Sequence, residues 1–485
     1  MSRDLLLSVD IGSTYTKGGL FALEGETLHL IGREVVPTTV DDLGRGFSQV
    51  RAAVLSRHLN RGHNTNSPFL GAGGAPAQAI PVYWSSSARG GLKIAAVGLT
   101  PDLTLSVARM AATSAGGKVV RAYSYELTPE DLDDLRAIEP DIILFTGGTD
   151  GGNSRVVLHN AARLAGLVSP AIILYAGNRK VRDQVVDLLR GREVVTAANV
   201  MPEVGTIDTE PVRDVIRRVF LERIVDGKGL SSVVAEAGRE PLPTPLAVFE
   251  LVRTIAERVP GWGDFALIDM GGATTDFYSH TKSFHGGDAV ILRGLLEPTL
   301  KRTVEGDLGL RVSAEALFRS EASFLEGRLR EAGTDIAPLR SYVEKVSRRT
   351  DHLPADDEGR RFDRLLAAAC VRAAALRHAG VLQRVFTPQG GFLVQRGKDL
   401  RQVGRIVGSG GYLAGETRPD ILLEACAPGA DDPDTRHLVP EAPACYADID
   451  YLIPLLGNLA ADLPGEAARA AVAGLVPLTL QTNGS

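Results

Sequence analysis

The feature that most constrains this chain is an acidic, glycine-rich turn that occurs twice. The first copy follows the apolar residues 5–9 and reads Asp10-Ile11-Gly12-Ser13-Thr14-Tyr15-Thr16-Lys17. The second follows the apolar residues 265–268 and reads Asp269-Met270-Gly271-Gly272-Ala273-Thr274-Thr275-Asp276. One Asp-x-Gly turn usually closes an ordinary hairpin. Two copies after strand-like apolar runs predict a duplicated domain with a nucleotide between its halves.

The residues of these turns are the types that a nucleotide site needs. Glycine lets the backbone approach an anion, and successive N–H groups form a concave anion-binding nest. The candidate phosphate donors are Gly12, Ser13, Thr14, Gly271, Gly272, Ala273 and Thr274. Asp10 and Asp269 are the candidate ligands of a hydrated Mg²⁺ and the candidate catalytic carboxylates. Lys17 either pairs with the terminal phosphate or points into solvent.

The pair of turns resembles the two phosphate loops of the actin-like ATPase superfamily, which includes sugar kinases, the 70-kDa chaperones and hydantoinase-type enzymes. That superfamily also has an adenosine motif late in the chain, a strand followed by Gly-x-Gly-Gly. Residues 404–412, Gly-Arg-Ile-Val-Gly-Ser-Gly-Gly-Tyr, fit it in kind and in order. The resemblance implies bound Mg²⁺-ATP, with Gly408, Gly410 and Gly411 packed against adenosine.

A closer resemblance is to the MutL (GlmL) family, the accessory proteins of adenosylcobalamin-dependent glutamate mutase. Besides the two turns, it is carried by residues 37–40, 85–92, 146–152, 175–178 and 199–202. The resemblance implies an ATP-dependent, chaperone-like reactivating factor with probable Mg²⁺-dependent ATPase activity. Such a protein opens and closes its two halves to release damaged cobalamin from a partner mutase, here glutamate mutase or a related enzyme.

The order of expected elements predicts an α/β fold with four parts. Residues 1–92 are the first part of the first actin-like half. Residues 93–200 alternate strands and helices, which predicts an inserted, parallel, flavodoxin-like domain. Residues 201–262 return to the first half and contain the hinge. Residues 263–485 form the second half, with a charged helical insertion at about 313–361.

The inserted domain is similar in outline to the cobalamin-binding domains of the mutases. Those domains supply a cobalt ligand from an Asp-x-His-x-x-Gly loop, which has no match here, and His159 falls on an expected helix. We therefore predict no tight cobalamin site of that kind. The glycine-rich loop at 147–152 is either functional or a tight strand-to-helix turn.

Several other segments leave two interpretations open. The hydroxyl-rich residues 85–91 read as a loop that either contacts phosphate or links domains. Residues 297–304 read as helical. The acids within residues 303–309 either orient water or Mg²⁺, or are solvated at a helix end. Residues 362–379 read as a helix whose apolar face includes Cys370, which favours a core cysteine.

Composition excludes several classes of function. The formal charge of −6 and the pI near 5.9 argue against a nucleic-acid partner. No apolar run reaches about 18 residues, so we expect no membrane span. The three cysteines, Cys370, Cys426 and Cys445, lack metal-binding or disulfide spacing. Together with an N-terminus without a signal-peptide pattern, this indicates the cytoplasm.

Three other functions compete with a reactivating factor. A small-molecule kinase of the same fold needs a carboxylate base beside an acceptor pocket. The sequence points to no such pocket. For the base that activates water in ATP hydrolysis, Asp276, Glu250 and Asp150 are candidates, and none stands out. An electron activator of a CoA dehydratase resembles this chain at residues 10–17 but needs cysteines for an iron–sulfur cluster. A binding module without catalysis is the third.

Overall fold

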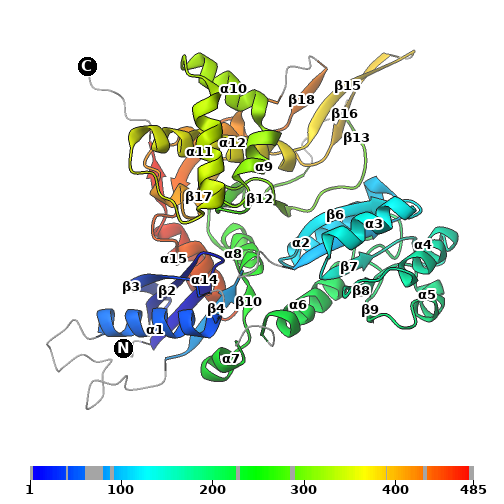
Figure 1. The fold of residues 1–485 in the computed structure, drawn as a ribbon, viewed down its shortest axis with the longest axis horizontal. Helices are drawn as coiled ribbons and strands as arrows, with labels where there is room; N and C mark the ends of the chain where they lie inside the picture. Colours follow the sequence, from blue (N-terminus) through cyan, green and yellow to red (C-terminus); the bar gives the residue numbers. More distant parts are fainter. Residues whose placement is uncertain are drawn as a thin grey trace. The chain divides into compact units, whose positions relative to one another are not determined.

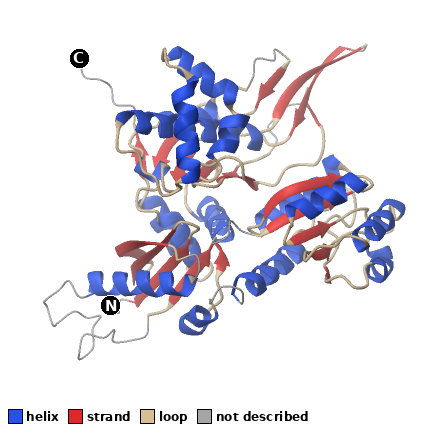
Figure 2. Cartoon of the chain, viewed as in Figure 1, coloured by secondary structure: helices blue, strands red, loops and turns tan. Residues whose placement is uncertain are grey.

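The computed structural model describes residues 4–39, 42–59, 80–87, 92–225, 230–283, 290–388, 390–429 and 434–479. Residues 40 and 88–91 of the segments discussed above lie outside this set. The chain forms two compact units. Unit 1 comprises Met1–Leu251 and Pro454–Ala470, and unit 2 comprises Val252–Ile453 and Ala471–Ser485. Helices and strands occur in both units (Figure 2).

The first sheet of unit 1 has the strand order β10-β4-β1-β2-β3. Its strands are β1 (Asp4–Ile11), β2 (Tyr15–Glu24), β3 (Thr27–Pro37), β4 (Val82–Ser86) and β10 (Leu242–Pro243). The first three strands are antiparallel, whereas β4 and β10 run parallel to β1. Helix α1 (Leu43–Leu59) covers the sheet, and the Val50 side chain lies 3.1 Å from where a Cβ on Gly18 would be.

The central sheet of unit 2 repeats this order as β14-β12-β11-β17-β19, with β20 added at the edge. The strands are β11 (Phe265–Met270), β12 (Thr275–His280), β14 (Leu300–Glu305), β17 (Arg405–Ser409), β19 (Ala444–Ala447) and β20 (Val476–Leu478). Strands β11, β12 and β14 are antiparallel, and β17 and β19 run parallel to β11, as in unit 1. The repeated order confirms two duplicated actin-like halves.

Two local predictions were wrong. Residues 297–304 were expected to be helical, but β14 (Leu300–Glu305) pairs with β12 along its whole length. Successive side chains of this segment point to opposite faces of the sheet, as in a strand: Thr303 contacts His378 on one face, and Arg302 contacts Asp276 on the other. The loop expected at 85–91 begins with the last two residues of β4, Ser85 and Ser86, both of which are buried.

The second sheet of unit 1 is entirely parallel, with the order β6-β5-β7-β8-β9. This is the flavodoxin-type order 2-1-3-4-5 and confirms the predicted inserted fold. The strands are β5 (Lys93–Gly98), β6 (Lys118–Ser124), β7 (Ile142–Phe145), β8 (Ile172–Tyr175) and β9 (Val194–Thr196). The accompanying helices are α2 (Ser106–Ser114), α3 (Pro129–Ile138), α4 (Arg155–Ala165) and α5 (Arg182–Leu188).

Short helical turns and further helices complete these parts of the chain. A π-helical turn, Pro101–Leu105, leads directly into α2, and a 3₁₀ turn, Arg179–Val181, precedes α5. Downstream lie α6 (Glu210–Val225), α7 (Ser231–Ala237) and α8 (Thr244–Arg258). Near the end of the chain lie α13 (Asp420–Leu423), α14 (Leu452–Leu459) and α15 (Pro464–Ala473), with 3₁₀ turns at Leu413–Gly415 and Glu424–Cys426.

The helical part of unit 2 packs on one side of its central sheet as a single hydrophobic core. It contains α9 (Ala314–Ser320), α10 (Ala322–Glu331), α11 (Ile336–Arg348) and α12 (Asp357–His378), labelled in Figure 1. Cys370 is fully buried in this core, which confirms the expectation that it is a core residue. Arg311 forms a two-contact ion pair with Asp363 at 2.9 and 2.7 Å, and Tyr342 donates to the same carboxylate at 2.8 Å.

A four-stranded sheet that the sequence did not predict lies beside this core, in the order β13-β16-β15-β18. Its strands are β13 (Val290–Leu292), β15 (Val381–Thr387), β16 (Gly390–Arg396) and β18 (Thr435–His437). Strands β15 and β16 form a long hairpin that extends outward from unit 2 (Figure 1).

The end of helix α12 is held on the central sheet by a buried histidine. His378 has no exposed surface, and its ring nitrogens contact Ser279 Oγ at 2.7 Å and Thr303 Oγ1 at 2.8 Å. The Lys301 ammonium donates to the His378 carbonyl at 3.2 Å. Burial, followed by the charges of Lys301 and Lys398, lowers the pKa of His378 well below 6.5, so the folded protein keeps this ring neutral.

This burial predicts that unit 2 loses stability in acid. Below a pH of about 6.5, His378 becomes protonated in the unfolded chain but stays neutral in the folded protein. The free energy of unfolding therefore falls by up to about 1.4 kcal/mol per pH unit as the pH decreases. His378→Gln should have a shallower pH dependence. Urea unfolding between pH 7 and 5, in a Trp84→Phe background where Trp262 reports on unit 2, measures it.

His29→Gln, which replaces an exposed histidine of unit 1, is the matched control and should keep the wild-type slope. An unchanged slope in His378→Gln would show that another group causes the acid sensitivity.

Candidate functional site

The first candidate phosphate loop is the tight turn between β1 and β2. The Gly12 amide donates to the Tyr15 carbonyl at 3.0 Å and closes the turn. A Cβ on Gly12 would lie 2.7 Å from that same carbonyl oxygen, so only glycine fits. Ser13 and Thr14 form the exposed tip. The Thr38 amide donates to the Thr14 carbonyl at 2.9 Å, and the Thr38 hydroxyl donates to the Gly12 carbonyl at 2.9 Å.

Asp10, at the end of β1, is almost completely buried, and hydroxyl groups hold its carboxylate in place. Thr244 Oγ1 donates to Oδ1 of Asp10 at 2.6 Å, and Ser85 Oγ donates to the same oxygen at 3.2 Å. Lys17 lies directly opposite Asp10 in the β1–β2 register, so the two side chains share one face of the sheet. The carboxylate is thereby fixed at the strand end next to the loop.

Thr244 is a site residue that sequence reasoning missed. It lies within a proline-rich stretch, residues 241–245. In the structure, β10 (Leu242–Pro243) pairs with β4, and Thr244 starts helix α8. A threonine at the start of a helix, followed directly by a proline, is a common capping pattern. This pattern was the only signal in the sequence that could have drawn attention to Thr244.

The second candidate loop, between β11 and β12, has the same turn. The Gly271 amide donates to the Thr274 carbonyl at 2.9 Å. The loop lies on a support segment, residues 306–313, that follows the third strand of this sheet just as Thr38 follows β3. Gly309 packs so closely that a Cβ there would lie 2.6 Å from the Ala273 carbonyl carbon.

The support segment binds three successive carbonyl groups of the second loop. The Leu310 amide donates to the Gly271 carbonyl at 3.3 Å, and the Arg311 amide donates to the Gly272 carbonyl at 2.9 Å. The Ser313 hydroxyl donates to the Ala273 carbonyl at 2.7 Å. In a trans peptide the C=O and the following N–H point in opposite directions.

None of the peptide bonds that the structure describes is cis, so the direction of each of these carbonyl groups also sets the direction of the amide that follows it. The N–H groups of Gly272, Ala273 and Thr274 must point away from the support segment. The same argument turns the N–H groups of Ser13 and Tyr15 away from Thr38. A row of such N–H groups is what an anion nest requires, and the second loop presents the longer row.

The adenosine motif and the second loop are brought together within unit 2. Gly410 has a φ of +94°, and a Cβ there would lie 2.3 Å from the Met270 carbonyl oxygen and 2.8 Å from Oδ1 of Asp269. Gly408 instead packs against Leu422, 3.0 Å from its would-be Cβ. Nothing lies within 4 Å of a Cβ on Gly411, so this glycine borders open space.

Asp269 and Asp276 lie opposite each other in the β11–β12 register, and two like charges in that position repel. Arg302 on β14 offsets this repulsion, since its Nε and Nη2 donate to Oδ1 of Asp276 at 2.9 and 2.6 Å. Arg302 is 5% exposed, and Asp276 is 9% exposed. The pair leaves Asp269 as the carboxylate next to the loop and Gly410.

Arginine side chains engage all three candidate bases. Asp276 forms an ion pair with Arg302, as described above. Glu250 forms an ion pair with Arg213 at 2.8 Å, and Asp150 forms one with Arg179 at 3.1 Å. Asp150 also accepts from Asn199 Nδ2 at 2.9 Å within the 147–152 loop. These contacts give each of the three carboxylates a structural partner.

The acids within residues 303–309 are bound to the end of helix α12. Arg377 contacts Glu305 at 2.9 Å and Asp307 at 2.7 and 2.9 Å. Both carboxylates therefore anchor the support segment of the second loop to α12. The alternative that they lie solvated at a helix end is wrong, because Glu305 ends a strand.

The cysteines are core residues. Burial raises the pKa of Cys370 and Cys445 to about 12 and that of Cys426 to about 11, so all three remain thiols at neutral pH. Among the described residues, no group of three or more His, Cys, Asp or Glu side chains is arranged to hold a metal ion. Within the same residues, no helix is long and apolar enough to cross a membrane.

The residues present fit Mg²⁺-ATP chemically, because each loop has outward N–H groups and follows a strand that ends in or near an aspartate, Asp10 or Asp269. Asp10, Gly12, Ser13, Thr14 and Lys17 form one group in unit 1. The other group lies in unit 2 and comprises Asp269, Gly271, Gly272, Ala273, Thr274, Gly408, Gly410 and Gly411.

Several solved structures are similar to the chain, all at low TM-scores. A gluconate kinase from Lactobacillus acidophilus has a TM-score of 0.34 and 9% identity, covering 99% of this chain and 93% of the kinase. A diol dehydratase-reactivating factor in nucleotide-free form has a TM-score of 0.29 and 12% identity, covering 87% and 94%. The actin-like fold of the two halves follows from their repeated strand order and not from these similarities.

Comparison of the sequence with known proteins shows the family of the chain. The family model described as MutL protein matches residues 6–473. Protein MutL from Clostridium tetanomorphum is 36% identical over 478 residues, which cover 96% of this chain and 98% of that protein. The match spans residues 10–17, 269–276 and 404–412 as well as the inserted domain. The chain therefore belongs to the MutL protein family.

Proposed function

We propose that this protein is an ATP-dependent, chaperone-like reactivating factor. Its client is an adenosylcobalamin-dependent mutase, such as glutamate (methylaspartate) mutase, from which it releases damaged cobalamin. The observation that carries the proposal is the row of three outward N–H groups at Gly272, Ala273 and Thr274, in the turn that follows Asp269. A second copy of this arrangement, at residues 10–17, and membership of the MutL family support it.

In this proposal the two loops bind one Mg²⁺-ATP. The N–H groups and hydroxyls of both loops hold the phosphates, and Asp10 and Asp269 hold Mg²⁺, mostly through water. When bound, Mg²⁺ neutralises charge on the phosphates. Gly410 and Gly411 border the adenosine, and Lys17 lies on the Asp10 side of the first loop. ATP hydrolysis here depends on positioning and charge neutralisation, not on a covalent intermediate.

We propose that nucleotide chemistry does mechanical work in this protein by way of its two loops. ATP favours an arrangement of the units in which both loops contact the phosphates, and loss of the γ-phosphate removes that preference. We propose that this shift loosens the cobalamin in the client. The same proposal includes boundaries between the parts of the chain at residues 92, 200 and 262 and a hinge near residues 240–262. It also includes a cytoplasmic location.

A small-molecule kinase is the alternative. It needs a carboxylate base ready to take a proton from an acceptor. The engagement of Asp276, Glu250 and Asp150 by arginines counts against each of them in that role.

The release of an inactive cobalamin tests the proposal directly. The client mutase is loaded with an inactive cobalamin analogue and mixed with this protein and Mg²⁺-ATP. Analogue in the low-molecular-mass fraction is then measured by absorbance. We expect release that requires ATP and falls at least about tenfold in Asp269→Asn, because about 1.4 kcal/mol of lost phosphate or metal binding suffices for that factor.

Asp351→Asn, which changes an exposed carboxylate outside both loops, is the control and should release the analogue normally. ATP hydrolysis without any release would instead favour the kinase, and a screen of phosphate acceptors would follow.

A pair of glycine variants tests the adenosine motif. Gly410→Ala places a methyl group against the Met270 carbonyl and the Asp269 carboxylate at a positive φ, so we expect nucleotide affinity to fall by about tenfold or more. Gly404→Ala, at the start of residues 404–412, enters open space away from the proposed adenosine-binding glycines and should bind within about threefold of wild type. Titration with a fluorescent ATP analogue measures both. Equal affinities in the two variants would contradict the placement of this motif.

A further inference from the structure

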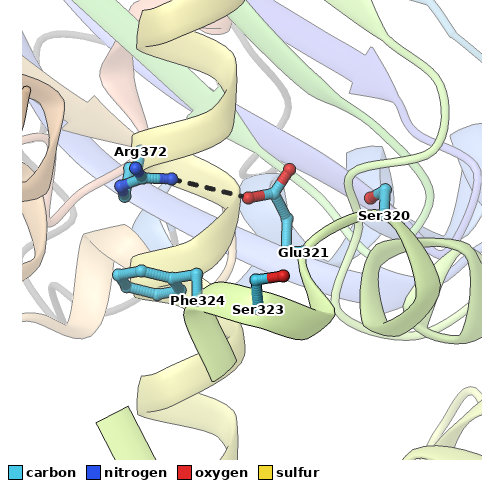
Figure 3. A pocket seen from close by; sticks show the side chains of 5 residues that line it. All are labelled: Ser320, Glu321, Ser323, Phe324 and Arg372. Carbon is cyan, nitrogen blue, oxygen red and sulfur yellow. Dashed lines mark ion pairs between the residues drawn. The ribbon is translucent and has the colours of Figure 1, made fainter. Parts of the chain in front are cut away.

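The helical part of unit 2 contains a cavity of about 360 Å³ that is separate from the phosphate loops (Figure 3). It lies where α9 passes into α10, against one side of α12. Its lining residues are Ser320, Glu321, Ser323, Phe324 and Arg372. Ligand sites in proteins span roughly 300 to 1,000 Å³, so a cavity of this size suits a small ligand.

Two opposite charges face each other in this cavity without a close contact. Arg372 Nη1 lies 3.7 Å from Oε2 of Glu321, and Arg377 Nη2 lies 3.9 Å from Oε1. Both distances exceed hydrogen-bond length. The Arg372 and Glu321 side chains are only 19% and 14% exposed. Both charges are therefore partly withdrawn from water, yet the pair between them is loose.

Phe324 supplies an apolar wall beside these charges. The Arg372 guanidinium carbon lies 5.1 Å from the centre of the Phe324 ring, and Figure 3 shows the two side chains next to each other with Arg372 directed toward Glu321. Arg372 is also held by the Pro428 carbonyl at 3.4 Å. The guanidinium is thereby fixed in orientation while part of its donor fork faces Glu321.

We propose that this cavity binds a small zwitterion of the amino-acid type. Its carboxylate pairs with Arg372, its ammonium pairs with Glu321, and its side chain packs against Phe324. A simple anion would be repelled by Glu321, and a simple cation by Arg372. A zwitterion replaces one loose ion pair by two charge-assisted hydrogen bonds.

The state of Glu321 agrees with this assignment. Burial raises its pKa, and this effect outweighs the opposing charges of Arg377 and Arg372. The two guanidinium groups stay 3.7 and 3.9 Å from this carboxylate, so an ammonium group can supply a closer donor than either arginine does. The hydroxyls of Ser320 and Ser323 add polar groups at the rim. The site goes beyond the proposed ATPase and needs no nucleotide.

Calorimetric titration of the full-length protein without nucleotide tests the site. L-Leucine is the probe, and acetate and methylammonium represent its two charged halves. We expect L-leucine to bind with a Kd in the millimolar range or below, and each half to bind at least about tenfold more weakly. No binding of L-leucine at millimolar concentration, or equal binding of acetate, would overturn the proposal.

Variants locate the binding. Arg372→Gln and Glu321→Gln should each lose L-leucine binding. Ser323→Tyr should also lose it, because a bulky side chain at this exposed position fills the cavity without removing a charge, which keeps the test decisive if a charge variant misfolds. Arg340→Gln is the control, since Arg340 stacks on Phe318 at 5.7 Å outside the cavity. Wild-type binding in both Arg372→Gln and Ser323→Tyr would overturn the assignment.

Discussion

The candidate site depends on one property of the peptide bond, the opposite directions of its C=O and N–H groups. In each half, the segment after the third strand binds the carbonyls of the phosphate loop and so turns the amides outward. Thr38 does this in the first half, and Leu310, Arg311 and Ser313 do it in the second. Without these contacts, the loop amides would have no fixed direction.

The two halves meet the same requirement with different side chains. In the first, hydroxyls of Ser85 and Thr244 hold the buried Asp10. In the second, Arg302 neutralises Asp276 and thereby separates it from Asp269. Each solution avoids leaving a buried carboxylate without partners, which is strongly unfavourable. The two halves thus share their strand order, whereas the side-chain contacts that hold their carboxylates differ.

The support of the second loop extends far into the helical part of unit 2. Arg311 joins Asp363 of α12, and Arg377 of α12 joins Glu305 and Asp307. His378 then fixes the end of α12 on β12 and β14. These contacts make helix α12 part of the scaffold of the loop, although it supplies no candidate ligand of the phosphates.

Much of this architecture could be predicted from the sequence, because strands buried on both faces read as apolar runs. β1, β11 and the inner strands β5, β7 and β8 of the inserted domain are of this kind. Strand β14 was missed because its buried Arg302 looks like a surface residue until Asp276 is placed beside it. β4 was missed because Ser85 and Ser86 are buried through hydrogen bonds and not through apolar character.

The long hairpin of β15 and β16 was missed for the opposite reason. Its side chains are largely exposed, including Phe386 at 69%, so no buried face imposes a clear pattern. Thr244 was missed because its role depends on Asp10, which is distant in sequence. Contacts of this kind follow from topology and cannot be read from local spacing.

The central claim is that one nucleotide is held by both loops. Calorimetric titration of the protein with a non-hydrolysable ATP analogue and Mg²⁺ tests it most directly, using wild type, Asp10→Asn and Asp269→Asn. The account predicts one nucleotide per chain and a loss of affinity of about tenfold or more in each variant. Two nucleotides per chain, or wild-type affinity in either variant, would contradict it.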